Sequence, residues 1–157
     1  MNPKSVRESQ SELSELALPN DANGLGNLLG GKLMHLMDIA GSLAAARHAR
    51  TFVVTAAFDH MSFLSPVRIG QLVLLRSSVN RVFRTSMEVG VKAFVEDLLT
   101  GERKHVASAY LTFVALDGVQ KPVPAPPVIP ETEDEKRRYA EAEERRAYRM
   151  QLSNKNV

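Results

Sequence analysis

The segment that most constrains the fold is a long helical pattern that follows a turn-rich loop. Pro, Asn, Asp and Gly crowd residues 19–31, and this composition forbids regular structure there. After Gly30 and Gly31, apolar residues recur every three or four positions up to about Arg50, and other apolar side chains fill the remaining faces. A helix that is apolar on nearly every side is expected to be buried on most of its surface. The rest of the chain must therefore pack around this helix.

The predicted helix carries a single carboxylate, Asp38. It lies about 10 Å, or two turns, beyond Gly31 on nearly the same helix face. The first N–H groups of a helix are unpaired and partly positive, and glycines there let a ligand approach the backbone. This pattern fits an oxyanion site beside a carboxylate with a chemical role, because an ionised carboxylate is seldom left in apolar surroundings. It also fits a plain glycine turn with a partly exposed or Arg-paired Asp, which this stretch alone slightly favours.

One motif in this segment is misleading. Residues 26–32 match the first part of the phosphate-binding loop G-x-x-x-x-G-K-[ST]. Leu33 then stands where a Ser or Thr would hold magnesium, and no strand rich in Val or Ile precedes the loop. We therefore exclude a nucleoside triphosphatase.

Composition narrows the function classes further. The chain of 157 residues has the size of one domain, and its net charge of +2 is too small to predict nucleic-acid binding. Without cysteine it has no disulfide, thiol nucleophile or thiolate metal site, and its four histidines show no ligand spacing. Residues 1–10 contain no apolar signal core, and the apolar helix carries His35, Asp38 and Arg47. We therefore expect a cytoplasmic protein without metal, cofactor, nucleic-acid partner or membrane partner.

The segment after the helix has the composition of β-strands. Alternating, β-branched or aromatic residues predict four strands, at residues 51–63, 70–83, 85–97 and 103–116. Phe94 is the exception to the alternation of the third strand, and the fourth is apolar on both faces, as a central strand would be. Short connections imply a mostly antiparallel sheet that buries one face on the helix, an α+β fold. Since the helix is apolar on more sides than one sheet covers, we expect a second copy of the molecule to bury the remainder.

The two ends of the chain are expected to lie outside this domain. Residues 1–10 are polar and predicted to be flexible. Residues 11–18, at the start of the domain, are expected to form a short strand or a turn. Residues 121–157 combine a proline-rich linker with a charged helix that Thr132 can cap. Most of that helix is expected to be solvated, with a thin docking stripe made of Tyr139, Ala142, Arg146 and Met150. We expect this tail to be dispensable for any chemistry.

Residues 20–38, N-D-A-N-G-L-G-N-L-L-G-G-K-L-M-H-L-M-D, closely resemble the hot-dog-fold acyl-CoA thioesterases of the YciA-like and cytosolic long-chain type. The resemblance runs in consistent order from about residue 12 to 120 and includes segments 53–59, 63–70, 84–89 and 109–115. It implies a hot-dog domain over residues 11–120, in which a curved antiparallel sheet wraps a long central helix. It also implies homodimers that pair their sheets edge to edge, and homohexamers built as trimers of dimers.

The same resemblance implies hydrolysis of acyl-CoA to a free acid and CoA, without a metal or cofactor. Asp38 matches the family's general base or nucleophile. Asn23 matches the residue that positions the water or the thioester, across the dimer interface from the Asp. Gly31, with Gly30 beside it, matches the helix start that polarises the thioester carbonyl. These roles agree with the physics of a helix N-terminus, since fixed N–H dipoles stabilise developing negative charge.

Binding of CoA requires basic groups that meet its phosphates. Arg84, Thr85 and Ser86, at a turn that enters a strand, are the first candidates for this role. Arg68, Arg81 and Lys104 are weaker candidates, and each of these bases is equally compatible with an ordinary solvated side chain. Two apolar strand residues, Val54 and Phe58, can line an acyl channel or simply belong to the core.

Two competing functions stay open. A non-catalytic acyl-CoA sensor uses the same fold, but such sensors carry an extra DNA-binding module, for which the residues before residue 12 leave no room. A hydratase would need an Asp–His pair near the helix start. His35 lies on the helix, but the loop at residues 19–31 fits that reaction poorly.

Overall fold

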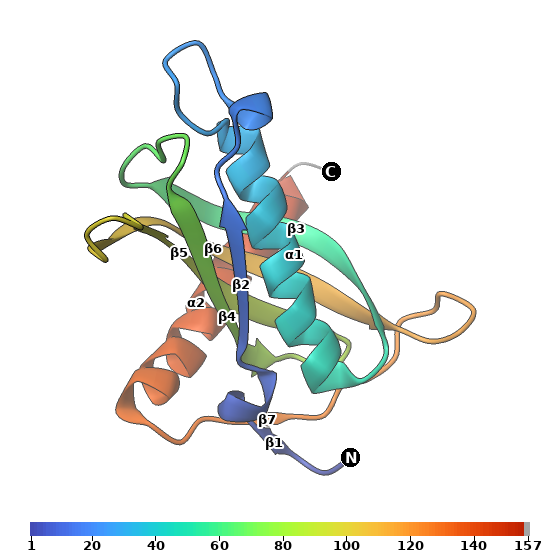
Figure 1. Cartoon of the computed structure of the whole chain (residues 1–157). Helices are drawn as coiled ribbons and strands as arrows, with labels where there is room; N and C mark the ends of the chain where they lie inside the picture. The colour runs from blue at the N-terminus through green and yellow to red at the C-terminus, as the bar shows by residue number, and fades with distance from the viewer. Residues whose placement is uncertain (156–157) are drawn as a thin grey trace.

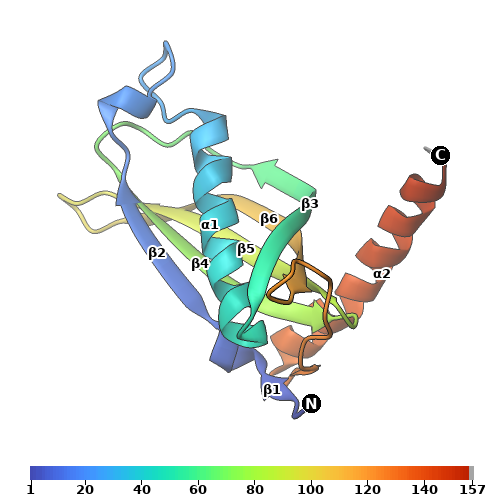
Figure 2. The ribbon, with the colours of Figure 1, turned by 90° about the vertical axis from the view of Figure 1, so that its right-hand side faces the viewer.

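The structure is a computed structural model that describes residues 1–155. A five-stranded antiparallel sheet has its strands in the spatial order β2 (Ser11–Leu16), β4 (Leu72–Val82), β5 (Ser86–Glu96), β6 (Arg103–Leu116) and β3 (Phe52–Phe63) (Figure 1). One face of the sheet packs against α1 (Gly30–Ala49), and α2 (Glu133–Lys155) lies on the opposite side (Figure 2). The predicted α+β arrangement, with a long helix on an antiparallel sheet, is confirmed. Residues 11–16 form a strand, which resolves the open alternative for this segment.

α1 packs on the sheet through an almost purely apolar surface. Its buried side chains are Leu33, Leu36, Met37, Ala40, Ala44, Ala45 and Ala49, together with His48. At Gly41 the helix approaches the sheet so closely that a Cβ atom would lie 3.0 Å from the ring of Phe113. Met34 and Leu43 nevertheless stay 38% and 40% exposed, because a single sheet covers only part of the helix. The chain therefore leaves apolar helix surface uncovered, as the sequence predicted.

β3 follows α1 in the chain but forms an edge of the sheet, next to β6. Its register against β6 shifts twice, between Thr55 and Ala57 and between Phe58 and His60. Such bulges insert an unpaired residue and change where the neighbouring side chains point. The irregular part of the edge strand thus lies between residues 55 and 60.

Phe94 is an apolar residue on the polar face of β5. Burial alternates through it, because Ala93 and Val95 are buried whereas Phe94 is partly exposed. The register shift between Ala93 and Phe94 leaves Val106 of β6 without a partner and does not turn Phe94 to the other face. The Phe94 ring packs against His105, with ring centroids 5.2 Å apart, and the guanidinium of Arg76 lies 5.7 Å from the Phe94 ring. β6 lies between β5 and β3, which confirms its predicted central position.

The first ten residues are not the loose segment that we predicted. β1 (Lys4–Ser5) precedes the short 3-10 helix η1 (Val6–Ser9), and Val6 and Ser9 are buried. Lys4 Nζ donates hydrogen bonds to the carbonyl groups of Arg47 and His48, at 3.0 and 2.8 Å. The last carbonyl groups of a helix are unpaired and partly negative, so they attract a cation. This interaction with the end of α1 cannot be read from the polar composition of the segment.

The proline-rich linker is attached to the domain through backbone hydrogen bonds. β7 (Val128–Ile129) pairs in parallel with β1, and the Ala125 N–H donates to the carbonyl of Arg84 at 2.8 Å. α2 then begins directly after Thr132, whose hydroxyl accepts a hydrogen bond from the Glu135 N–H at 3.1 Å. The predicted cap is therefore confirmed. Within residues 1–155 no helix is long and apolar enough to cross a membrane.

Candidate active site

Asp38 lies on the side of α1 that meets the edge strand β3. Its Oδ1 atom accepts a hydrogen bond of 2.6 Å from the hydroxyl of Thr55. The carboxylate is partly exposed, and no cation in residues 1–155 forms an ion pair with it. Asp38 is therefore held by a hydroxyl group and stays open to a ligand, which disagrees with the interpretation of an Arg-paired Asp. The sequence analysis did not single out Thr55, since a Thr in a strand is ordinary, although segment 53–59 belongs to the resemblance.

The start of α1 offers free hydrogen-bond donors. The helix begins at Gly30, after Leu29, and no side chain caps it. In the described part of the chain, the N–H groups of Gly30 and Gly31 meet no acceptor, whereas those of Lys32 and Leu33 bond to the Leu29 carbonyl. No atom lies within 4 Å of a Cβ placed on Gly31, so the space beside it is open. Two unpaired N–H groups beside open space can bind an oxyanion.

Asn23 shapes the loop before this helix. Its side-chain Oδ1 accepts hydrogen bonds from the N–H groups of Leu25 and Asn27, at 2.9 and 3.1 Å. The residue is exposed, and among residues 1–155 no contact joins it to Asp38. One chain alone therefore does not bring the predicted Asn and Asp together.

Arg84 occupies the turn between β4 and β5 with an unusual backbone. Its φ of +139° lies in a region that residues with a side chain rarely adopt. The turn is anchored by backbone hydrogen bonds, since the Arg84 and Thr85 carbonyls accept from Ala125 and Ala115, both at 2.8 Å. The Arg84 side chain is exposed, and Ser86 begins β5. The turn thus presents a guanidinium to solvent in a fixed place.

Two other predicted residues do not lie beside Asp38. Val54 and Ser86 align with the same β6 residue, Val114, and so form one row across three strands. Side chains of consecutive strand residues point to opposite faces, so Val54 and Thr55 diverge. Because Thr55 reaches Asp38, Val54 and Ser86 belong to the face turned away from α1. Phe58 packs against the core cluster.

The weaker base candidates separate into two groups. Arg68 and Lys104 are exposed. Arg81 is engaged with α2, because its guanidinium lies 4.1 Å from the centre of the Tyr139 ring and 3.4 Å from the Glu143 carboxylate. Arg81 is therefore a structural residue of this interface.

The histidines are scattered. His35 and His60 are exposed, and His105 Nε2 lies 2.7 Å from the hydroxyl of Ser108. His48 is buried, and its Nε2 lies 2.7 Å from the carbonyl of Pro126. Burial lowers the pKa of His48 below its ordinary value of 6.5, although the hydrogen bond to Pro126 opposes this effect. Among the described residues, no three His, Cys, Asp or Glu side chains are grouped so as to hold a metal ion.

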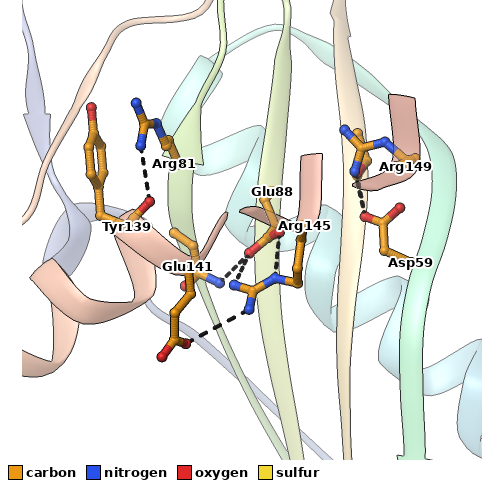
Figure 3. Close-up of polar contacts among 9 residues, drawn as sticks. Asp59, Arg81, Glu88, Tyr139, Glu141, Arg145 and Arg149 are labelled. Carbon is orange, nitrogen blue, oxygen red and sulfur yellow. Dashed lines mark hydrogen bonds and ion pairs between the residues drawn. The ribbon is translucent and has the colours of Figure 1, made fainter. Parts of the chain in front are cut away.

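α2 is bound to the sheet by ion pairs that sequence reasoning missed (Figure 3). The carboxylate of Glu88, 1% exposed, accepts two hydrogen bonds from Arg145, at 2.9 and 2.7 Å, and one from Asn80. The Arg145 guanidinium also lies 3.7 Å from the centre of the Tyr110 ring. Burial acts to lower the pKa of Arg145, but the hydrogen bonds and charge of Glu88 outweigh it and raise that pKa. Arg145 also lies 3.8 Å from the carboxylate of Glu141, one turn earlier on the same helix.

A second pair connects α2 to β3. Asp59 Oδ2 accepts a hydrogen bond of 2.9 Å from Arg149 and one of 2.7 Å from the hydroxyl of Thr112. Part of the predicted docking stripe is confirmed, since Ala142 is fully buried and Arg146 lies over the Phe83 ring. The expectation of a mostly solvated helix is confirmed, since Ala142 is the only buried residue among the described residues of α2. Met150 of the predicted stripe stays 46% exposed. The sequence did not reveal that buried carboxylates of the sheet have their partners on α2.

A cavity of about 440 Å³ opens on the same face of the sheet as α2. Its lining includes Arg76, Lys92, Tyr110 and Arg138, but neither Asp38 nor Thr55. This cavity is therefore separate from the carboxylate that carries the candidate chemistry.

The sequence of the chain matches those of known proteins. The sequence profile of the thioesterase superfamily matches residues 25–102. The chain is 47% identical over 129 residues to the uncharacterized acyl-CoA thioester hydrolase YkhA of Bacillus subtilis, covering 82% of this chain and 75% of that protein. It is 37% identical to the cytosolic acyl coenzyme A thioester hydrolase of Rattus norvegicus over 91% of this chain, but spans only 38% of that relative's length.

Solved structures agree over nearly the whole chain. An apo hexameric acyl-CoA thioesterase superposes with a TM-score of 0.93 and 39% identity, covering 98% of both chains. The acyl-CoA hydrolase of Staphylococcus aureus, in complex with butyryl coenzyme A, coenzyme A and coenzyme A disulfide, has a TM-score of 0.91 and 34% identity. That match covers 98% of this chain and 93% of the other, and single-alanine variants of the same enzyme at an Asp, an Asn and a Thr are similar too. The chain therefore belongs to the acyl-CoA thioester hydrolases of the hot-dog thioesterase superfamily.

Proposed function

We propose that this protein hydrolyses the thioester of acyl-CoA to a free acid and CoA, with Asp38 as general base or nucleophile. The observation that carries the proposal is the hydrogen bond between Asp38 and Thr55 at the junction of α1 and β3. It fixes an unpaired carboxylate on a helix whose first N–H groups are free. In the S. aureus enzyme, the Asn, Asp and Thr replaced by Ala follow one another at the same intervals as Asn23, Asp38 and Thr55.

The reaction follows from the groups present. Asp38 takes a proton from water that attacks the thioester carbonyl, or attacks the carbonyl itself. The carbonyl oxygen then becomes negative, and the N–H groups of Gly30 and Gly31 stabilise it. The C–S bond then breaks, and in the general-base route the CoA thiolate takes up the proton held by Asp38 and leaves as the thiol. In the nucleophilic route the thiolate takes its proton from solvent, and water then hydrolyses the mixed anhydride on Asp38, which releases the acid and restores the carboxylate. Thr55 keeps the carboxylate oriented, so no metal or cofactor is needed in this scheme.

We further propose that each site is shared between two chains. Asp38 lies about 10 Å along the helix from Gly31 of its own chain, whereas an oxyanion donor must lie within about 3 Å of the oxygen it stabilises. In the shared site, a second chain supplies Asn23 and the N–H donors, so that the donors lie close to the thioester that Asp38 of the first chain reaches. The open edge of β3, with Phe52 73%, Val54 47% and Phe63 55% exposed, supports edge-to-edge pairing, because an exposed apolar edge strand is normally covered.

Assembly, binding and location follow the same relatives. We propose a homohexamer built as a trimer of such dimers, as the hexameric thioesterase with the same fold suggests. Arg84, Thr85 and Ser86 remain our candidates for contacts to CoA, the ligand bound in the S. aureus structure. A cytoplasmic location is proposed on the basis of the relatives named cytosolic.

Release of CoA tests the activity directly. Acyl-CoAs from acetyl to palmitoyl are offered to the protein, and the free thiol is trapped with a dye. We expect thiol release by the wild type and almost none by Asp38→Asn. Binding of acyl-CoA without thiol release by the wild type would instead establish a non-catalytic sensor.

Subunit mixing tests the shared site. Asn23→Ala and Asp38→Asn chains are co-refolded, and exchange is verified by mass spectrometry. In a mixed dimer one shared site carries both changes and the other carries neither. Random pairing makes about half of the dimers mixed, so about a quarter of the sites should be active in a symmetric dimer. If both residues came from one chain, mixing would restore nothing.

A further inference from the structure

The ion pair between α2 and β3 lies close to the residue that holds Asp38. We propose that Arg149 is a positioning residue: through Asp59 it fixes the bulged part of β3, and thereby the Thr55 hydroxyl that orients Asp38. This inference rests on the proposed function, because it assigns Arg149 to the same site. It replaces the expectation that the tail has no part in the chemistry.

Asp59 is the unpaired residue of the second bulge. β6 pairs Leu111 with Phe58 and Tyr110 with His60, so no residue of β6 lies opposite Asp59. Its side chain is 8% exposed, and Oδ2 accepts from both Thr112 and Arg149, at 2.7 and 2.9 Å. Because Asp59 has no partner in the β3–β6 ladder, it is held in place by its side-chain contacts. Figure 3 shows Arg149 of α2 pointing at Asp59 from outside the sheet.

Thr55 lies at the start of the same irregular segment. The first bulge inserts Ala56 directly after it, because Thr55 pairs with Phe113 and Ala57 with Thr112. Both bulges therefore fall between Thr55 and His60. β3 is an edge strand, and a strand paired on one side is less restrained than an inner strand. A relaxed bulge changes where Thr55 points, and the bond of 2.6 Å to Asp38 leaves little room for displacement.

The two pairs on α2 converge on one residue of β6. Thr112 aligns with Ala57 of β3 on one side and with Glu88 of β5 on the other. Arg145 holds Glu88, Arg149 holds Asp59, and the Thr112 hydroxyl binds Asp59. The Arg149–Asp59 pair thus connects α2 directly to the segment that carries Thr55, and Thr112 adds a second contact to Asp59 from β6. Removing Arg149 leaves a nearly buried carboxylate with one donor, which favours local rearrangement of the bulge.

The experiment compares Arg149→Met with Arg137→Met in the full-length assembled protein. Arg137 lies on the same helix, and its pair with Asp134 is 58% and 74% exposed. For Arg149→Met we expect kcat to fall about tenfold with KM within about twofold, and amides of residues 55–60 to exchange hydrogen at least about tenfold faster. Arg137→Met should change neither. If Arg149→Met does not assemble, Asp59→Asn is measured in its place.

A second background separates positioning from a general loss of structure. In Thr55→Ala, where the proposed connection is already broken, Arg149→Met should lower kcat by less than about twofold. Equal factors in both backgrounds, or unchanged exchange of residues 55–60, would overturn the proposal. Faster exchange with unchanged kcat would overturn it as well. If the wild type itself releases no CoA, the proposed function fails. That outcome differs from failure of the positioning proposal, because hydrogen exchange still reports on the connection from Arg149 to β3.

Discussion

α1 and α2 cover opposite faces of one sheet with opposite chemistry. α1 packs through apolar side chains such as Leu36 and Met37, both nearly fully buried. α2 buries only Ala142 completely among its described residues and is attached by Arg145 and Arg149, which neutralise two carboxylates of the sheet. The first helix is held by non-directional burial, and the second by hydrogen bonds of fixed geometry.

This difference determines what each helix can do. Apolar burial fixes α1 firmly, so Asp38 has a stable platform for chemistry. Ion pairs are directional and depend on both partners, so α2 can fix particular points of the sheet, such as Asp59 in the edge strand. The proposed reacting group therefore lies on α1, and we infer that α2 controls its alignment.

The largest effect is expected on catalysis, at Asp38 of α1. Asp38→Asn should lower kcat by about 10²- to 10⁴-fold, the range typical of a lost general base, because the amide cannot take a proton. The melting temperature and CoA binding should change little, since the side chain is partly exposed. Steady-state kinetics and thermal melting are the measurements, with Asp134→Asn on α2 as the control. Turnover near that of the wild type would refute the role of Asp38.

At α2 the expected loss is in the free energy of unfolding. Arg145→Met leaves the carboxylate of Glu88, 1% exposed, without its cation, and breaking a buried pair on one side costs about 3–5 kcal/mol. Urea unfolding measures this loss. Arg137→Met, in an exposed pair, should cost less than about 1 kcal/mol. Adding Glu88→Met to Arg145→Met should recover much of the stability, and failure to recover would mean that Arg145 acts by packing alone.

A smaller effect is expected at the strained turn. Arg84→Gly relieves a backbone with φ of +139°, worth about 1–3 kcal/mol, while the more flexible unfolded chain offsets about 1 kcal/mol. We expect a net gain of about 1 kcal/mol in unfolding free energy, together with a severalfold higher KM for acyl-CoA. Arg84→Lys retains both the charge and the strain. Its gain in unfolding free energy and its rise in KM should therefore both be smaller than those of Arg84→Gly. An unchanged KM in Arg84→Gly would remove Arg84 from the CoA site.

The smallest effect concerns the end of α1. Burial lowers the pKa of His48 in the folded state below the ordinary value of 6.5, so below that pH the unfolded chain binds the proton more readily. The contribution of His48 to stability is therefore complete above pH 6.5 and is lost as the pH falls from 6.5 to the folded pKa. His48→Gln can donate to the Pro126 carbonyl but does not titrate. Between pH 7.5 and 5, the melting temperature of His48→Gln should fall less than that of the wild type. An equal dependence of melting temperature on pH in both proteins would contradict the prediction.

The sequence alone was enough to predict the elements that depend on local pattern. Apolar periodicity after Gly31 marked α1, alternation marked the strands, and Thr132 marked the start of α2. The helix start followed from its two glycines. These predictions succeed because periodicity and capping act within a few residues of the chain. The role of Asp38 came from the resemblance to the thioesterases and stays a prediction.

The tertiary structure decided the interactions between distant segments. Thr55 meets Asp38 only because β3 crosses to the edge beside β6, and Asp59 meets Arg149 across ninety positions of the chain. Glu88 is one residue in an alternating strand by pattern, and nothing local reveals that it is buried and paired with Arg145. Likewise Lys4 reaches the end of α1 from a segment that looked loose. Charged side chains acquire their partners through topology, and a single sequence contains no record of which distant charges the fold brings together.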